Sequence, residues 1–322
     1  MEAADLMKTA ALAFLASGFL YAALDPAAIN NPATRDSVGP NCTGAAVVRA
    51  QILLDRAHFS PAEITGSYNP NLRIAIFGYQ SAHKLAMTGT VDASTWQSLD
   101  RDSERVLIEY TLRPEDVRGP FQKTPLTIAE MARMKWMTYE SPEQELGEMF
   151  HLSPALLGAL NPGADFHKAG QRILVPHIQR DVPLLMAHQI ILSRANRSVT
   201  LFTALGHVIA QYPATMGSEE DPYPPGEWSV GHVEFTPTFY YNPTRFWNGT
   251  SLDAQAKIAP GPHSPTGSVW IGLDRLHYGI QGTPDPSRIG QPEKKGCIRL
   301  TNWDAMELSG LVRKGTPLAF RQ

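Results

Sequence analysis

The spacing of apolar positions divides the chain into a helical first part and a β-rich last part. Apolar residues recur at helical spacing in residues 47–54. Two further short helices are expected at residues 72–80 and 95–99, and turns rich in Gly, Asn and Asp separate the three. We therefore predict a small helical bundle over residues 45–102.

The middle of the chain, residues 103–182, predicts a small module that contains two helices. Ser141-Pro142 and Ser153-Pro154 each combine an N-capping hydroxyl residue with a proline at the first helical position. Gln144 stands at the capping-box position of the first helix. A Pro-Gly turn then leads into an apolar strand at residues 170–176.

From residue 184 onwards, the pattern is that of β-strands. Strand-like runs are found at residues 190–193, 198–202, 208–212, 267–273, 277–280, 298–300 and 317–320. One late helix is predicted to open at the capping pattern Thr301–Asp304 and to continue through Leu311. The predicted fold class is multidomain α+β, in which residues 183–322 form a mainly β domain with one late helix.

The start of the chain has the pattern of a targeting segment. Lys8 precedes an apolar run that ends at Leu24, which predicts a signal peptide or anchor over residues 1–28. An uncleaved membrane anchor and a buried helix are the alternatives, and the N-terminus would be the only membrane attachment. Residues 29–44 are rich in Pro, Asn and Ala and predict a linker. We favour export to the periplasm or cell envelope.

Composition limits the classes of function. Hydrophobic residues make up 43% and charged residues 18% of the 322 residues, which allows packed cores. The net charge of −3 gives no electrostatic support for a nucleic-acid partner. The two cysteines, Cys42 and Cys297, lie far apart and show no disulfide or metal-binding pattern. We therefore expect no metal and no cofactor.

The strongest candidate for chemistry is Cys297. A cysteine attacks an acyl carbon as a thiolate, and a preceding glycine permits a tight backbone whose N–H groups can face an oxyanion. Lys295 and Gly296, with Cys297 itself, are the expected backbone donors. Arg299 could favour the thiolate, bind a substrate carboxylate or make a structural salt bridge. A small buried hydrophobe is the alternative interpretation of Cys297.

The ordered set of motifs around this cysteine resembles the L,D-transpeptidase family. Residues 277–300 contain Gln281-Gly-Thr, a loop ending in Ile289-Gly290, and Gly-Cys-Ile-Arg-Leu. Flanking segments that also fit lie at residues 212–217, 222–226, 241–243 and 259–267. The resemblance implies a cell-wall enzyme whose cysteine forms a thioester with a peptidoglycan stem peptide and transfers it to an amine acceptor.

Two N-terminal segments resemble modules that bind peptidoglycan. The first resembles the peptidoglycan-binding three-helix domain through the residues Phe77, Gln80, Thr88, Gly89, Asp92 and Trp96. The second, at residues 141–176, resembles a LysM module, a small glycan-binding fold, although its first strand is poorly formed. The implied partners are the stem peptides and the glycan of peptidoglycan.

Two residues depart from the family pattern. Gln281 stands where the family has its base histidine, and an amide cannot accept a proton at neutral pH. Lys294 replaces the expected serine, and with Lys295 it could lower the pKa of Cys297 or simply lie in a solvated loop. His277, a candidate for substrate binding, would lie about 13 Å from Gln281 along a regular strand, too far to replace the base.

The functional alternatives therefore differ in catalytic competence. The first is an active transpeptidase. The second is a catalytically impaired relative that binds peptidoglycan, and a third is a cysteine protease or amidase with a base from elsewhere. His263 and His232 lie in the same domain, and the sequence does not place either of them at the site.

Overall fold

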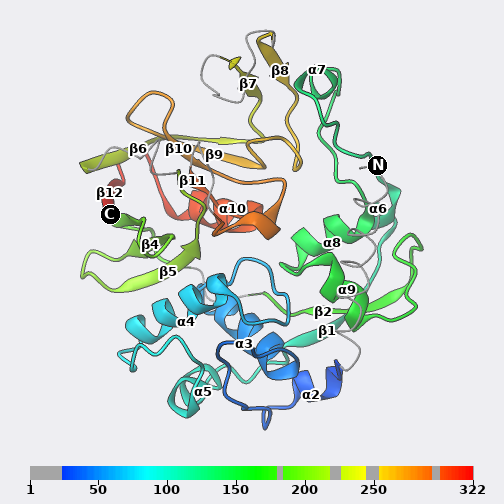
Figure 1. Cartoon of the computed structure of the whole chain (residues 1–322), viewed down its shortest axis with the longest axis vertical. Coiled ribbons are helices and arrows are strands. Elements are labelled where there is room, and N and C mark those ends of the chain that lie inside the picture. Colours follow the sequence, from blue (N-terminus) through cyan, green and yellow to red (C-terminus); the bar gives the residue numbers. More distant parts are fainter. Residues whose placement is uncertain (1–23, 180–183, 218–225, 244–253, 292–297, 322) are drawn as a thin grey trace, which may run out of the picture.

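A computed structural model describes residues 24–321 apart from residues 180–183, 218–225, 244–253 and 292–297 (Figure 1). The predicted signal peptide lies almost entirely outside the described residues. Within the described ranges, no helix is both long and apolar enough to span a membrane.

The first part of the chain is helical, as predicted. Its helices are α2 (Pro26–Asn30), α3 (Ala45–Arg56), α4 (Pro70–Ala82) and α5 (Ala93–Leu99). Side-chain caps define two of the starts, because Asn69 accepts a hydrogen bond from the Leu72 amide and Asp92 accepts one from the Thr95 amide. Apolar side chains of α3 and α4 then pack together to form the bundle core.

The segment predicted as a linker is packed against this bundle. Ile29 of α2 and Val38 are fully buried, and Val38 forms an antiparallel bridge with Val91. The indole Nε1 of Trp96 donates to the carbonyl of Asp36 at 3.0 Å. The composition of this segment is typical of a loop, and its two buried apolar residues, Ile29 and Val38, are too isolated to give a periodic pattern.

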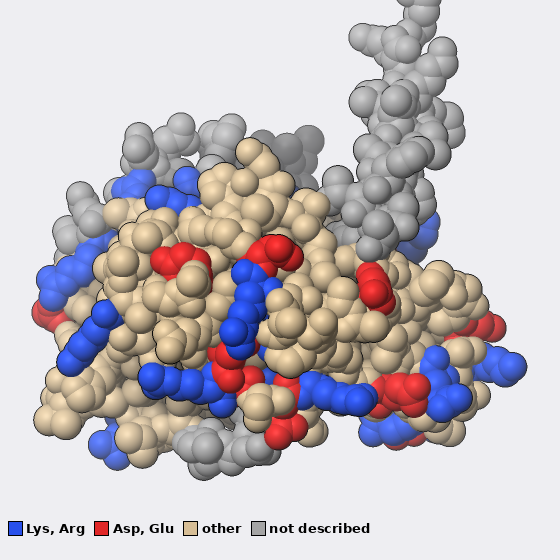
Figure 2. Space-filling model, turned by 90° about the horizontal axis from the view of Figure 1, so that it is seen from below, with Lys and Arg blue, Asp and Glu red and all other residues tan. Residues whose placement is uncertain are grey.

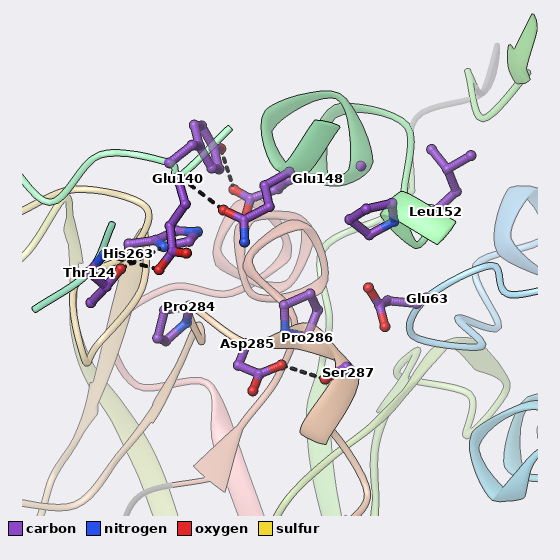
Figure 3. Close-up of a pocket in the computed structure, with 14 residues that line it drawn as sticks. Glu63, Thr124, Glu140, Glu148, Leu152, His263, Pro284, Asp285, Pro286 and Ser287 are labelled. Carbon is purple, nitrogen blue, oxygen red and sulfur yellow. Dashed lines mark hydrogen bonds between the residues drawn. The ribbon is translucent and has the colours of Figure 1, made fainter. Parts of the chain in front are cut away.

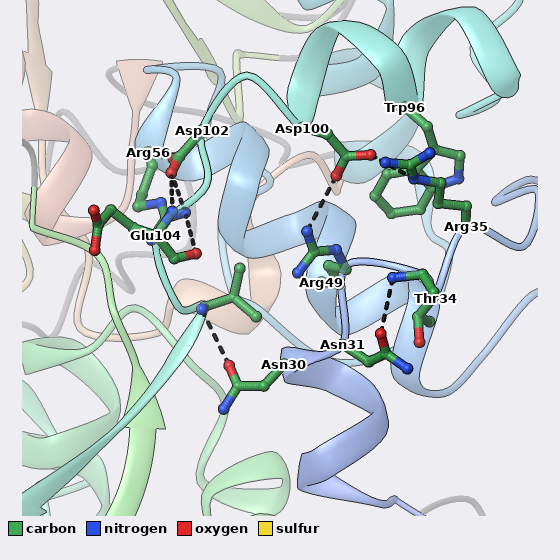
Figure 4. Close-up of polar contacts among 12 residues, drawn as sticks. Asn30, Asn31, Thr34, Arg35, Arg49, Arg56, Trp96, Asp100, Asp102 and Glu104 are labelled. Carbon is green, nitrogen blue, oxygen red and sulfur yellow. Dashed lines mark hydrogen bonds and ion pairs between the residues drawn. The ribbon is translucent and has the colours of Figure 1, made fainter.

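Charged side chains form local pairs on this part of the molecule. Asp100 accepts from Arg35 at 2.7 Å and from Arg49 at 3.1 Å, while Arg56 pairs with Asp102 at 2.7 Å (Figure 4). Figure 2 shows Lys and Arg interspersed with Asp and Glu over one face of the molecule. This mixed face agrees with the absence of a strong net charge.

Gln80 holds the turn after α4 with a buried hydrogen-bond network. Its side-chain amide donates to Thr88 Oγ1, the Thr90 carbonyl and Thr95 Oγ1, and its oxygen accepts from the Thr88 and Gly89 amides, at 2.9–3.0 Å. The glutamine of the peptidoglycan-binding pattern therefore has a structural role.

We expect Gln80→Ala to lower the free energy of unfolding by about 3 kcal/mol, because several buried polar groups lose their partner. Urea unfolding of the full chain measures the change. The matched control is Gln97→Ala, on the exposed face of α5, which should shift stability by less than about 0.5 kcal/mol. Equal effects of the two substitutions would contradict this structural role.

The middle module contains both predicted helices and a strand that the sequence analysis missed. Its elements are β1 (Leu107–Thr111), α6 (Pro114–Arg118), α7 (Ile128–Met131), α8 (Pro142–Met149), α9 (Pro154–Leu160) and β2 (Arg172–Pro176). The expectation of a poorly formed first strand was wrong, because β1 pairs antiparallel with β2 along its whole length. Residues 112–141, including α6 and α7, separate β1 from α8 and extend toward the C-terminal domain (Figure 1).

The two N-terminal modules share one hydrophobic core. Buried residues from Ile29 to Val175 belong to a single cluster that contains residues of α3, α4, α9 and β2. Ile64, between α3 and α4, also forms a parallel bridge with Leu152. The helical bundle and the LysM-like module are therefore one folded unit.

The C-terminal part is built on a sheet of eight strands. They are β3 (Gln189–Ser193), β4 (Ser198–Phe202), β5 (Val208–Pro213), β6 (Gly226–Phe235), β9 (Val269–Leu273), β10 (Gly279–Gln281), β11 (Ile298–Arg299) and β12 (Pro317–Arg321). Their order is β11-β10-β9-β6-β12-β3-β4-β5. A separate pair, β7 (Phe239–Tyr241) and β8 (Ala256–Ile258), lies near α7 (Figure 1).

The sheet curls until its two ends meet. Thr215, just after β5, exchanges both backbone hydrogen bonds with Arg299 of β11, at 3.0 and 2.9 Å. The late helix α10 (Asn302–Leu311) packs against β9 and β10, and Thr301 caps it by accepting from the Asp304 amide. A second hydrophobic core lies between the helix and the sheet. The predicted mainly β domain with one late helix is confirmed.

Polar contacts at strand β5 and helix α10 join the two units. The backbone of residues 58–60 pairs with Gln211 of β5, and the Gln211 side chain donates to the Ile74 carbonyl at 2.8 Å. Glu307 of α10 bonds His58 Nδ1 at 2.8 Å and the Tyr212 hydroxyl at 2.9 Å. These contacts hold the N-terminal unit against the C-terminal domain.

Candidate active site

Strands β10 and β11 bring two of the predicted site residues together. They run parallel, with Gln281 in register with Arg299, and the Leu300 amide donates to the Gln281 carbonyl at 2.9 Å. Residues 294–297, which include the predicted nucleophile Cys297, its backbone donors Lys295 and Gly296, and Lys294, lie outside the described residues. In the sequence, Cys297 directly precedes Ile298, the first residue of β11.

The side chain of Gln281 is buried and held in place. Only 5% of the residue is exposed, and its Nε2 donates to the Pro265 carbonyl at 2.8 Å. The turn containing Pro265 therefore lies directly against the side chain of Gln281. The amide can orient a neighbouring group, but it has no proton-accepting nitrogen.

The structure separates His277 from this position. His277 is exposed in the turn between β9 and β10, with φ of 72°, and the strand expected at residues 277–280 begins only at Gly279. It precedes β10, whereas Gln281 ends it, so the two residues lie at opposite ends of the strand. His232 is also exposed, on β6 opposite Gly272.

Asn302 links the segment just before β9 to helix α8. Its Oδ1 accepts from the Ser268 amide at 2.9 Å, and its Nδ2 donates to Glu148 Oε2 at 2.8 Å. Gly282 is required here, because a Cβ at this position would lie 2.1 Å from Asn302 Oδ1. The glycine of the Gln-Gly-Thr motif thus allows close packing around the site.

A cavity of about 450 Å³ lies next to Glu148 and His263 (Figure 3). Its walls come from three places: Glu63 of the helical bundle, residues 124–154 of the middle module, and His263 with residues 284–287 of the C-terminal domain. The carboxylates on its walls are those of Glu63, Glu140, Glu148 and Asp285. Among the residues that line the cavity, Pro284 is the nearest to Gln281 in the sequence, three positions after it.

Burial changes the protonation of these groups. Burial, assisted by the charge of Asp285, raises the pKa of Glu63 to about 7. Burial also raises the pKa of Glu148, although Asn302 and Tyr139 donate to this carboxylate. Burial would raise the pKa of Glu140 as well, but hydrogen bonds from the backbone and side chain of Thr124 bring it below its ordinary value. Glu63 and Glu148 therefore keep their protons to higher pH than ordinary carboxyl groups, whereas Glu140 loses its proton at lower pH.

Among the described residues that line this cavity, His263 supplies an imidazole. It is 7% exposed, its Nδ1 bonds Thr124 Oγ1 at 3.1 Å, and its ring packs edge-on against Tyr139. Burial lowers the pKa of His263, and the charges of Glu140 and Asp285 oppose that shift. A neutral imidazole can accept a proton, which Gln281 cannot.

The cavity contains residues that the sequence analysis did not single out. Asp285 lies within the signature loop and could have been chosen from the motif alone. Glu63, Glu140 and Glu148 lie in other modules, and no local pattern connects them with Gln281. Among the described residues, no cluster of His, Cys, Asp or Glu has the arrangement of a metal site.

The curled sheet, the adjacent strands β10 and β11, and the Gly-Cys-Ile-Arg motif define the class of L,D-transpeptidases. The L,D-transpeptidase catalytic domain family matches residues 187–319, and the peptidoglycan binding domain family matches residues 43–99. The chain is 31% identical over 164 residues to a Bacillus licheniformis protein assigned as the L,D-transpeptidase YkuD. That match covers 50% of this chain and 82% of the relative.

Two further relatives complete the comparison. The chain is 30% identical over 168 residues to the protein assigned as YkuD in Bacillus subtilis strain 168, covering 52% of this chain and 85% of the relative. The crystal structure of an L,D-transpeptidase from Xylanimonas cellulosilytica is 14% identical, with a TM-score of 0.36, and the match covers 87% of this chain and 95% of that one. The chain belongs to the L,D-transpeptidase family. Its homologues support a cell-wall transpeptidase with peptidoglycan as partner and an extracytoplasmic location.

Proposed function

We propose that Cys297 is the nucleophile of a two-step acyl transfer on peptidoglycan stem peptides. The thiolate attacks the carbonyl carbon of the L,D amide in a donor tetrapeptide stem, the C–N bond breaks, and a thioester remains on Sγ, while the terminal residue leaves as an amine that takes a proton from solvent. An amine of another stem or of a protein, or water, then takes the acyl group. The observation that carries this proposal is the parallel pairing of β10 with β11, which begins directly after Cys297.

The surroundings of Cys297 supply the other roles in this proposal. The backbone N–H groups of Lys295, Gly296 and Cys297 stabilise the oxyanion. The ammonium groups of Lys294 and Lys295 favour the thiolate and so compensate in part for the missing histidine at position 281. Arg299, in register with Gln281, binds a substrate carboxylate or supports the thiolate.

The N-terminal unit keeps the enzyme on its polymer in this proposal. The peptidoglycan binding domain and the LysM-like module bind the glycan and the stem peptides, and a signal peptide exports the chain to the periplasm or cell envelope. Because polar contacts join this unit to β5 and α10, binding of the polymer would hold the catalytic domain at a fixed orientation.

A second candidate function is a catalytically impaired protein that binds peptidoglycan. The buried amide of Gln281, bonded to the Pro265 carbonyl, favours it because this amide cannot activate a thiol. The two candidates differ in one measurable property, the reactivity of Cys297.

Covalent labelling tests the proposal. The full chain is incubated with a carbapenem or with a tetrapeptide donor at neutral pH, and intact mass followed by peptide mapping locates the adduct. We expect one adduct, on Cys297, that is lost in Cys297→Ala and kept in Cys42→Ala. Cys42 is the matched control because it is a partly exposed free thiol, which donates to the Ser37 carbonyl at 3.5 Å. A folded chain that forms no adduct on Cys297 would leave the impaired binding protein as its function.

A further inference from the structure

We propose that the cavity where the three parts of the chain meet is a binding site for a primary ammonium group on an alkyl stem. The described residues that form it do not include Cys297, and binding of a ligand there does not depend on the proposed acyl transfer. Glu63 comes from the helical bundle, Glu140 and Glu148 come from the middle module, and Asp285 comes from the loop after β10. No single part of the chain would form this site alone.

The cavity has the size and the mixed lining of a small-molecule site. Its volume of about 450 Å³ lies within the range of about 300–1,000 Å³ that is usual for such sites. Among the described residues that line it, four have carboxyl groups and none is Lys or Arg. The apolar part of the lining includes Leu152, Pro154 and Pro286. An alkyl stem can therefore pack on apolar surface while its charged end lies among carboxyl groups.

Two polar side chains of this lining have atoms that the protein leaves without a partner. Within the described ranges, no hydrogen bond or ion pair engages the carboxyl group of Glu63, which is half-buried. His263 is 7% exposed and its Nδ1 bonds Thr124 Oγ1 at 3.1 Å, whereas no described residue forms a hydrogen bond with its Nε2. Withdrawing a polar atom from water without a partner costs free energy. A ligand that bonds to these two side chains would remove that cost.

The charges that face the cavity favour a cation. The pKa of Glu140 is below its ordinary value although burial would raise it, and the backbone N–H of Thr124 donates to this carboxylate at 3.0 Å. The charge of Asp285 also acts on Glu63 and His263. Burial lowers the pKa of His263, so its imidazole does not neutralise these carboxylates near pH 7. The cavity is therefore negatively charged, and a cation within it would favour ionisation of Glu63 as well.

An ammonium group fits this lining better than a metal ion does. Within the described ranges, no cluster of His, Cys, Asp or Glu has the arrangement of a metal site. The carboxyl groups come from three parts of the chain, and an ammonium has three N–H donors that can each reach a different acceptor. Figure 3 shows Glu63 and Asp285 approaching the space from different segments, with Glu140 and His263 on another side. The ligand class is therefore a lysine-like side chain.

A ligand that has no L,D amide tests this site separately from the acyl transfer. Nα-acetyl-lysine amide is titrated into the full chain at pH 8, where Glu63, with its pKa of about 7, is mostly ionised and the ligand remains protonated. ¹H–¹⁵N NMR follows the backbone signals, and we expect saturable shifts at Glu63, Glu148, His263 and Ser287. Nα,Nε-diacetyl-lysine amide has the same stem without the charge, and it should bind at least about tenfold more weakly.

Two substitutions test the contribution of individual carboxylates. Glu63→Gln and Asp285→Asn should each weaken binding of Nα-acetyl-lysine amide about fivefold, because each removes one charge from the cavity. The matched control, Glu234→Gln at an exposed position of β6, removes the same charge away from the cavity and should leave binding unchanged. Equal binding of the two lysine ligands, or unchanged binding in both folded cavity variants, would overturn the inference. A chain that is not labelled on Cys297 would count against the proposed function and leave this result unaffected.

Discussion

Gln281→His is expected to accelerate acylation of Cys297 by roughly 100-fold at neutral pH, because it supplies the general base that the family pattern has at this position. An imidazole N–H can donate to the Pro265 carbonyl, as the Gln281 amide does at 2.8 Å, and its other nitrogen remains able to accept a proton. The rate should acquire a dependence on pH with a midpoint near the ordinary histidine value of about 6.5. Rapid mixing with a carbapenem, followed by intact mass, measures this rate.

Gln281→Asn is the matched control, because it shortens the side chain and adds no base. We expect it to leave acylation unchanged or slower. If Gln281→His also leaves the rate unchanged, then the thiolate forms without help from this position, and Lys294 and Lys295 become the groups to test. A faster rate would indicate that the chain lacks a general base at position 281. An unchanged rate would indicate that other groups perform this role.

Asp304→Asn is expected to remove a large part of the pH dependence of stability. Asp304 is fully enclosed in α10, accepts from Ser60 Oγ at 2.9 Å and lies near the buried carboxylate of Asp55. Burial, with the charge of Asp55 as the next cause, raises its pKa to about 7. His151, which bonds Asp55 at 3.1 Å, only partly opposes the shift.

The sign follows from the raised pKa. The folded state holds this proton more tightly than the unfolded state, so the stabilisation is complete below about pH 4 and is lost as pH rises through about 7. The full chain should lose roughly 3 kcal/mol from this group between pH 5 and pH 8, and Asp304→Asn should not. Urea unfolding at both pH values measures the difference. Asp165→Asn, at an exposed loop position, should keep the dependence of the parent chain. An equal slope in Asp304→Asn would show that Asp304 is ionised in the fold.

Local signals in the sequence were sufficient for most helices and several strands. Ser141, Ser153 and Thr301 each mark a helix start and act as caps in the structure, because a capping bond depends on residues only three apart. Strand β4 also has the predicted bounds. Such elements are determined by neighbours along the chain.

Elements that depend on distant partners were missed. Strand β6 is ten residues long, but it has a register shift between Val230 and His232 and its last residues are mostly exposed, which removes a regular alternation. Strand β1 is only visible as a strand once β2 pairs with it. The predicted linker likewise depends on Val91 for its bridge at Val38.

The residues of the candidate site were likewise predictable only where they belong to one contiguous motif. Gln281 and Arg299 belong to one contiguous motif, and the structure brings them side by side. Glu63, Thr124 and Glu140 come from segments more than a hundred residues earlier and line one cavity with His263 only through tertiary packing. A sequence pattern cannot predict that contact, because it depends on how the insert of one module lies against another.

The backbone pairing of residues 58–60 with Gln211 has a practical consequence for work on the isolated catalytic domain. A truncated chain that begins near residue 184 would lack these residues, and β5 would have unpaired N–H and C=O groups facing solvent. Such an edge is a template for intermolecular pairing, so the shortened protein should self-associate through β5. In the complete chain, residues 58–60 of the N-terminal unit cover this edge of β5.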